Sequence, residues 1–411
     1  MEVSRIENKN IRRIYRNQSE AVVNALWEIF AERGYADKVI ERTLKADRRR
    51  GSGDRAFIAE TVYGIVRYRR LLEVLCDITS ISSMEDIWRM MGVYILREGG
   101  SLPPWSEFED IDVSYVEKKY EEVKHIRAIR ESIPDWMDKI GARELPNVWD
   151  KEIEALNRQA QVIIRANALK TTREALKEAL EKEGVRTREV EGLPYALEME
   201  ERKNVWDTDA FRSGAFEVQD ASSQRVAALL SPQAGMRVVD ACAGAGGKTL
   251  HLSSLMENKG SIIAMDIYPH KLEELKRRAR RAGISNVSTR VIESSKTIKR
   301  MAGTADCLLL DVPCSGMGIL RRNPDAKWKL RPEFLDEITA TQYHILSTYS
   351  KILKSGGRMV YATCSILPRE NHLQVERFLK ENSDFSLIEQ HSIYASVDGY
   401  DGFYMALMKK Q

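Results

Sequence analysis

The C-terminal half of this 411-residue chain alternates short apolar runs with helical patterns, beginning near residue 232. The runs that we interpret as strands are Arg237 to Asp240, Ser261 to Asp266, Val287 to Ile292, Asp306 to Asp311 and Arg358 to Thr363. Helices are predicted between them, including Pro269 to Ala282 and Pro332 to Lys354. Such alternation is typical of a parallel sheet with helices on both faces. The sequence therefore predicts a doubly wound α/β sheet, closed by an antiparallel pair, Phe385 to Ile388 and Gly402 to Met408.

Two other patterns precede this sheet. Residues from about 11 to 130 have apolar side chains three and four positions apart, as in Asp54 to Leu75, which predicts helices. Residues 161 to 220 combine a strand, Val162 to Asn167, with a helix from Thr172 to Lys182. We therefore expect three domains: an all-α domain with a connector over 1–130, a small α/β linker domain over 131–215, and the large sheet over 216–411.

Composition limits the class of protein. With 43% apolar and 30% charged residues the chain is not globally disordered, and it has no run of roughly 18 apolar residues that could span a bilayer. Its start lacks the apolar core of a secretion signal, and five cysteines in a chain of this size do not indicate a disulfide framework. We expect a monomer in the reducing cytoplasm, without metal or membrane. The net charge of +3 is too small to identify a polyanionic partner.

A loop of small residues joins the first strand of the sheet to its helix. It consists of Cys242, Ala243, Gly244, Ala245, Gly246, Gly247 and Lys248. A Walker A loop requires glycine where Cys242 stands, and the dehydrogenase fingerprint requires glycine where Thr249 stands, so neither applies. Asp266 ends the next strand, where a carboxylate accepts hydrogen bonds from ribose hydroxyls. A nucleoside site without a phosphate cradle suggests S-adenosylmethionine; the alternative is a tight glycine turn beside a helix-capping aspartate.

Two thiols each follow a predicted strand, in Asp311-Val312-Pro313-Cys314 and in Tyr361-Ala362-Thr363-Cys364-Ser365. The carboxyl ends of parallel strands share one edge of a sheet, so we expect the thiols to converge. Carbon 5 of a pyrimidine is a weak nucleophile, but a thiolate that adds to carbon 6 creates an enamine whose carbon 5 can attack a sulfonium. Asp311, hydrogen-bonded to ring nitrogen 3, would stabilise the developing charge. Amine methylases carry an aromatic residue where Cys314 stands, which argues against exocyclic nitrogen as the acceptor.

Taken together, these motifs resemble the RNA (cytosine-5) methyltransferases of the Sun/Fmu (RsmB) and Nop2/Sun family. The resemblance covers about residues 213 to 411 and rests on Phe216 to Ser222, Gly246 to Thr249, Asp311 to Gly316, Arg321 to Asp325 with Trp328, and Ala362 to Ser365. It implies a Rossmann-like methyltransferase sheet that uses S-adenosyl-L-methionine. It also implies that Cys364 is the nucleophile, that Cys314 assists product release, and that Cys242 to Lys248, Asp266 and Asp311 surround the cofactor. DNA methylases attack with the cysteine of the Pro-Cys pair, so two thiols favour RNA.

The upstream segments are also similar to parts of this family. Asp54 to Phe57 and Val62 to Arg70 resemble its helical NusB-like domain, and the segment from Asp135-Trp136 onward resembles its small RRM-like domain that contacts RNA. Two departures occur in the methylase motifs. Gly244-Ala245 stands in place of the usual Ala-Pro, and Glu293-Ser294-Ser295 in place of a Gly-Asp that contacts adenine, so that Glu293 is the candidate substitute.

The basic residues lead to separate predictions. Arg321, Arg322 and Lys327 follow the first thiol motif on a predicted loop, and we expect them to hold RNA phosphates beside the target base. Arg277 to Arg281 is interpreted as a solvated helix face. The expected substrate is ribosomal RNA, with transfer RNA as the second candidate. The alternatives are a catalytically decayed RNA-binding ribosome assembly factor, which the altered segment at Glu293 favours, and a DNA methylase.

Overall fold

The computed structural model describes residues 14–411, and residues 1–13 of the predicted helical domain lie outside this range. The chain forms two compact units. The first extends to Asn157 and also includes Arg322–Leu330, whereas the second comprises Arg158–Arg321 and Arg331–Gln411. The second unit therefore contains both the small sheet and the large sheet. The three-domain division expected from the sequence stays a prediction.

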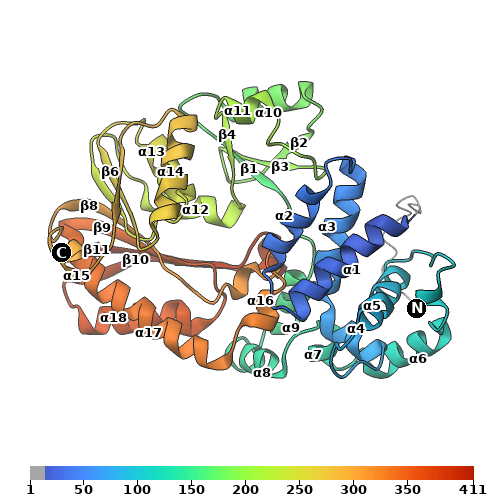
Figure 1. The fold of residues 1–411 in the computed structure, drawn as a ribbon. Helices are drawn as coiled ribbons and strands as arrows, with labels where there is room; N and C mark the ends of the chain where they lie inside the picture. The colour runs from blue at the N-terminus through green and yellow to red at the C-terminus, as the bar shows by residue number, and fades with distance from the viewer. Residues whose placement is uncertain (1–13) are drawn as a thin grey trace. The chain divides into compact units, whose positions relative to one another are not determined.

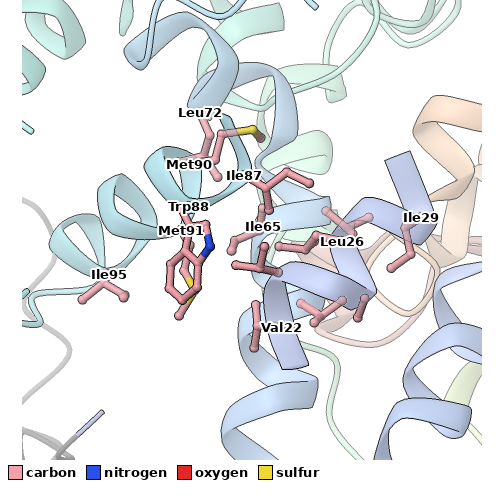
Figure 2. Packing of buried hydrophobic residues seen from close by; sticks show 14 of the residues in the cluster. Val22, Leu26, Ile29, Ile65, Leu72, Ile87, Trp88, Met90, Met91 and Ile95 are labelled. Carbon is pink, nitrogen blue, oxygen red and sulfur yellow. The ribbon is translucent and has the colours of Figure 1, made fainter. Parts of the chain in front are cut away.

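The first unit is helical. Its α-helices are α1 Arg16–Phe30, α2 Ala36–Ala46, α3 Ser52–Arg67, α4 Arg69–Leu75, α5 Met84–Arg97, α6 Val113–Val123, α7 Arg127–Arg130, α8 Asp135–Glu144, α9 Trp149–Leu156 and α16 Ala326–Lys329. The helix predicted over Asp54 to Leu75 is interrupted at Tyr68, where the backbone leaves helical geometry (ψ 22°). Apolar side chains of α1, α3 and α5 interdigitate in the core, including Leu26, Ile65 and Ile87, which are fully buried (Figure 2). Burial of these stripes is the main force that holds the helices together.

The second unit begins with a small antiparallel sheet in the order β2-β3-β1-β4. Its strands are β1 Ile163–Ala166, β2 Thr187–Glu189, β3 Ala196–Met199 and β4 Phe216–Val218, with helices α10 Arg173–Lys182 and α11 Asp209–Arg212. The predicted strand and helix are confirmed, and the Thr172 side chain caps α10 by accepting a hydrogen bond from the Ala175 amide. The other three strands have only three or four residues each, too few for a periodic pattern.

The large sheet has seven strands in the order β10-β11-β9-β8-β5-β6-β7. They are β5 Arg237–Asp240, β6 Ser261–Asp266, β7 Val287–Val291, β8 Ala305–Asp311, β9 Leu353–Thr363, β10 Phe385–Ile393 and β11 Phe403–Lys410. Strands β5 to β9 pair in parallel, and β11 runs antiparallel to both β9 and β10. The Rossmann-like prediction is confirmed. One boundary was wrong: the helix predicted from Pro332 to Lys354 ends at Tyr349, because Leu353 already belongs to β9.

Helices cover both faces of this sheet (Figure 1). One face carries α12 Ala221–Leu230, α13 Gly247–Leu255 and α14 Pro269–Ala282, and the other carries α15 Ser295–Lys299, α17 Pro332–Tyr349 and α18 His372–Glu381. The strands are therefore apolar on both sides. Asp240, Asp266 and Asp311 are the last residues of β5, β6 and β8, and Cys364 follows the end of β9. The topology thus brings these four residues to one edge of the sheet.

Within residues 14–411, none of the helices combines the length and apolar character needed to cross a bilayer. The same part of the chain holds no group of three or more His, Cys, Asp or Glu side chains arranged to bind a metal ion.

Candidate active site

The two motif thiols meet, as the strand topology predicts. The Sγ atoms of Cys314 and Cys364 are 3.0 Å apart, and both cysteines are free and half-buried. The hydrogen bond to Cys364 raises the pKa of the Cys314 thiol, and burial raises it further. The raised pKa favours the thiol form of Cys314, and either sulfur can be the donor in the contact between them.

A carboxylate that the sequence reasoning missed lies beneath this pair. Glu370, fully buried, accepts hydrogen bonds from the hydroxyls of Ser315 and Ser365, each of which directly follows a motif cysteine. It also accepts from the Ser315 amide at 2.8 Å and from Gln342 Nε2 at 2.9 Å. The sequence gives no signal for this role, because a charged residue such as Glu370 is ordinarily exposed to solvent.

The next carboxylate along the edge is paired with a lysine. Lys248 Nζ, on the first turn of α13, donates to Asp311 Oδ2 at 2.7 Å and lies 5.0 Å from the ring centroid of Phe403. Both side chains are partly exposed, with 12% and 28% of their surfaces accessible. The ammonium therefore fixes the orientation of the Asp311 carboxyl while leaving its second oxygen directed away from the pair.

The glycine loop is shaped for close approach by a ligand. Gly244 and Gly246 have positive φ angles of 53° and 90°, a conformation that side-chain-bearing residues rarely adopt. A Cβ atom on Gly246 would come within 2.5 Å of Leu275, so no larger residue fits there. Asp266 accepts hydrogen bonds from the amides of Gly244 and Tyr268, both at 2.9 Å. This carboxylate thus joins the loop to the end of β6.

Two arginines support the loop through its carbonyl groups. Arg165 of β1 donates to the Gly247 carbonyl, and Arg278 of α14 donates to the Ala245 carbonyl, both at 2.9 Å. Arg278 and Arg281 also pair with the buried Glu217. The prediction that Arg277 to Arg281 forms a solvated face was therefore wrong for Arg278 and Arg281, because this side of α14 faces β4.

Asp240 lies deepest at the edge of the sheet. Its Oδ2 accepts a hydrogen bond from the Thr249 hydroxyl at 2.7 Å, whereas its buried Oδ1 has no hydrogen-bond partner in the described part of the chain. Burial, assisted by the nearby Asp311 charge, raises the pKa of Asp240 to about 7. Burial likewise raises the pKa of the neighbouring Cys242 thiol, which disfavours its reactive thiolate form.

The residues expected to hold RNA phosphates are placed differently from the prediction. Arg321 is 4% exposed and donates to the Gly399 carbonyl at 2.8 Å, with Asp401 4.0 Å away. Lys327 is fully buried in the first unit, so neither side chain can reach a phosphate in this structure. The prediction was wrong for these two residues because both charges are used internally. Arg322 is half-buried, and its contact with RNA stays a prediction.

Lys327 instead forms the centre of a small network. Its ammonium donates to the carbonyls of Arg67, Glu131 and Ser132, at 3.1, 3.2 and 3.3 Å, and to Asn157 Oδ1. Burial lowers the pKa of Lys327 well below its usual range, and Arg67 lowers it further. The segment that contains α16 is thus held in the helical unit by the hydrogen bonds of the buried Lys327 side chain.

The loop and strand ends fit S-adenosylmethionine. Asp266 has lone pairs to spare for ribose hydroxyls, the Cβ-free turn at Gly244 and Gly246 admits a nucleoside, and the unpartnered Asp240 Oδ1 can accept from a donor group on the ligand. Glu293, exposed after β7, stays a predicted contact to adenine. When bound, this cofactor supplies a methyl group on a sulfonium. The fold and the loop define an S-adenosylmethionine-dependent methyltransferase.

Comparison with known proteins specifies the family. The family model for the 16S rRNA methyltransferase RsmB/F matches residues 227–409, and that for the RsmF/B-like ferredoxin-like domain matches residues 133–206. A probable ribosomal RNA small subunit methyltransferase B from Synechocystis sp. is 31% identical over 391 residues, which cover 85% of this chain and 86% of that protein. The corresponding protein of Proteus mirabilis is 35% identical over 282 residues, which cover 68% of this chain and 66% of that protein.

The solved structures agree on the fold. The crystal structure of a protein named PH0851 matches with a TM-score of 0.82 and 23% identity, over 98% of this chain and 100% of that one. The chain belongs to the RsmB/F family of methyltransferases.

Proposed function

We propose that this protein methylates carbon 5 of a cytosine in ribosomal RNA through a transient bond between Cys364 and the base. The observation that carries the proposal is the pair of thiols 3.0 Å apart, at the sheet edge that also bears the cofactor loop. The names of its relatives, ribosomal RNA small subunit methyltransferases, support ribosomal RNA as the substrate.

In the proposed reaction, the Cys364 thiolate adds to carbon 6 of the ring and a proton is placed on nitrogen 3. The resulting enamine makes carbon 5 nucleophilic enough to take the methyl group. Loss of the carbon 5 proton then re-forms the double bond, the bond between sulfur and carbon 6 breaks, and Cys364 leaves as a thiolate. Cys314, whose thiol lies beside this sulfur, assists that release.

Asp311 and Lys248 act on the ring nitrogen. Negative charge on the ring during thiolate addition is stabilised by a proton donor at nitrogen 3. Asp311 is the carboxyl group that reaches this position, and the Lys248 ammonium at 2.7 Å supplies the proton that the carboxyl passes on. Return of this proton during elimination restores the pair, and the carbon 5 proton, which a base takes up and passes to solvent, is the one proton released per turnover.

The target cytosine must leave its stack, because carbon 6 is shielded within a helix. We therefore propose that the substrate is a single-stranded or opened RNA segment.

A transcript of ribosomal RNA that contains 5-fluorocytosine tests the proposal, because fluorine cannot leave as the proton does. Wild-type protein with S-adenosylmethionine should form a stable RNA adduct that peptide mapping locates at Cys364, and Cys364→Ala should form none. Absence of a shifted gel band with wild-type protein would contradict the mechanism. Bisulfite mapping of cellular RNA with and without the gene then identifies the position, and a lost site in transfer RNA would replace ribosomal RNA as the substrate.

The second candidate, an RNA-binding assembly factor without activity, is favoured by Glu293-Ser294-Ser295 alone. Calorimetry that detects no binding of S-adenosylmethionine would support it.

A further inference from the structure

The loops that carry Cys314 and Cys364 are both hydrogen-bonded to the carboxylate of Glu370. Ser315 follows Cys314 and Ser365 follows Cys364, and both hydroxyls donate to the same oxygen, Oε1 of Glu370. The other oxygen, Oε2, accepts from the Ser315 amide and from Gln342 Nε2. Gln342 also donates to the Pro313 carbonyl at 3.0 Å, on the residue just before Cys314. Glu370 is therefore bonded to both loops at the positions next to the reactive sulfurs.

Because Glu370 is buried, the loss of its hydrogen bonds would be costly. A carboxylate without solvent is costly unless its lone pairs are filled, and Glu370 is 0% exposed with four donors around it. Removing it would take a charged acceptor away from two hydroxyls and a backbone amide, and would leave Gln342 Nε2 bonded to the Pro313 carbonyl. Neither loop can move away from the other without breaking one of these charge-assisted bonds.

The strands alone do not fix the distance between the thiols. Strands β8 and β9 pair in register up to Asp311 and Ala362, and both cysteines lie beyond that last pair. Past the ladder, backbone hydrogen bonds connect the loops only loosely: the Gly318 amide donates to the Cys364 carbonyl at 3.0 Å. The side chain of Glu370 accepts from both Ser315 and Ser365, whose hydroxyl oxygens also lie 3.3 Å from each other, so the carboxylate and this direct contact join the two loops.

We propose that Glu370 is a positioning residue that holds Cys314 and Cys364 within reach of each other, so that release of the methylated base follows its formation. The part of this proposal that concerns release rests on the proposed function; the part that concerns thiol distance does not. Loss of the carboxylate should separate the sulfurs, slow release more than methyl transfer, and cause protein to accumulate joined to RNA.

Oxidation by diamide measures the distance between the thiols without RNA. The two thiols lose two protons and two electrons to form a disulfide, and diamide takes them up as it becomes the hydrazine. Wild-type protein should give a linked Cys314–Cys364 peptide, found by mass spectrometry. Glu370→Ala should form it at least ten times more slowly, and Ser315→Ala/Ser365→Ala several times more slowly. Glu370→Gln, which keeps one carbonyl acceptor, should be intermediate.

The matched control is Glu376→Ala, which removes an exposed carboxylate from the same region of the chain. It should leave the cross-linking rate unchanged. Circular dichroism identifies variants that fold, and if Glu370→Ala does not fold, Glu370→Gln and the double serine variant carry the test. If a folded Glu370 variant, or the folded double serine variant, forms the disulfide at the wild-type rate, the proposal is overturned.

A second readout separates this proposal from the proposed function. With RNA substrate, Glu370→Gln should lower kcat with little change in KM and should raise the fraction of protein found as RNA adduct. Wild-type protein that methylates no cytosine, yet cross-links in a Glu370-dependent way, would refute the proposed function and leave the positioning role of Glu370 intact. If the wild-type protein methylates cytosine but the Cys314–Cys364 disulfide forms at the same rate without Glu370, the proposed function stands and the positioning role of Glu370 is refuted.

Discussion

The Sγ atoms of Cys314 and Cys364 lie 3.0 Å apart although 50 residues separate them in the chain. The parallel pairing of β8 with β9 creates this proximity, because each cysteine follows the carboxyl end of its strand. The hydrogen bond to Cys364 raises the pKa of the Cys314 thiol, and burial raises it further, which favours the protonated form of Cys314. We propose different roles for these two chemically identical side chains.

The two roles predict different outcomes for the two alanine variants. Cys364→Ala should lose turnover by several orders of magnitude, since it removes the proposed nucleophile. Cys314→Ala should still transfer the methyl group but accumulate protein covalently joined to RNA, visible as a slow band on a denaturing gel. Release of product at the wild-type rate by Cys314→Ala would show that the assignment of roles is wrong.

Asp240 predicts a dependence of stability on pH. Its pKa is about 7 in the folded chain against 3.8 when unperturbed, so the folded state binds this proton more tightly. The stabilisation is complete below pH about 4 and is lost as the pH rises through about 7, at about 1.4 kcal/mol per pH unit. Asp240→Asn resembles the neutral form, so it should become more stable relative to wild type as the pH rises from 5 to 7. Urea unfolding at several pH values, without cofactor, measures this difference.

Asp306 is the control, because its effect on the pH dependence of stability has the opposite sign to that of Asp240. A hydrogen bond from Lys354 lowers its pKa, so Asp306 stabilises the fold at neutral pH and loses that contribution on acidification. Asp306→Asn should therefore be less stable than wild type at pH 7, with a difference that shrinks as the pH falls. A flat profile for Asp240→Asn relative to wild type would refute the role of the buried carboxyl.

The sequence predicted the site best where local pattern decides position. Convergence of Cys314, Cys364 and Asp311 follows from strands that end at Asp311 or just before the cysteines, and strand ends can be recognised from apolar runs. Lys327 and Glu370 could not be placed in this way. Their partners come from distant positions, such as Asn157 for Lys327 and Gln342 for Glu370, so whether each charge is buried depends on tertiary structure alone.

Lys327 predicts a stability effect without an RNA effect. Lys327→Met removes the donor shared by three carbonyls and Asn157, and leaves buried oxygens unpaired. It should destabilise the helical unit by about 3 kcal/mol or more. Hydrogen exchange of the amides in α3 and α9 measures the loss. Lys38→Met, at a side chain that is 71% exposed, should change stability by about 0.5 kcal/mol or less.

Lys327→Met also tests whether Lys327 contacts RNA. Because the ammonium is buried, Lys327→Met should leave the salt dependence of RNA affinity unchanged, whereas loss of a phosphate contact would reduce the slope of log K against log salt by about 0.9. If Lys327→Met has normal stability but a reduced slope of log K against log salt, Lys327 contacts RNA after all.

Neighbouring arginines on α14 provide the last prediction. Arg278 donates to the Ala245 carbonyl at 2.9 Å and pairs with Glu217. Arg277 is 71% exposed and, within the described part of the chain, forms its ion pair with Glu274 of its own helix. Arg278→Met should loosen the glycine loop and raise the Kd for S-adenosylmethionine roughly tenfold, equivalent to about 1.4 kcal/mol. Arg277→Met removes the same charge from the next residue and should bind as wild type does. Calorimetry on both variants decides the matter: equal affinities would mean that the carbonyl bond does not shape the cofactor site, and equal losses would mean that net charge, rather than loop geometry, governs binding.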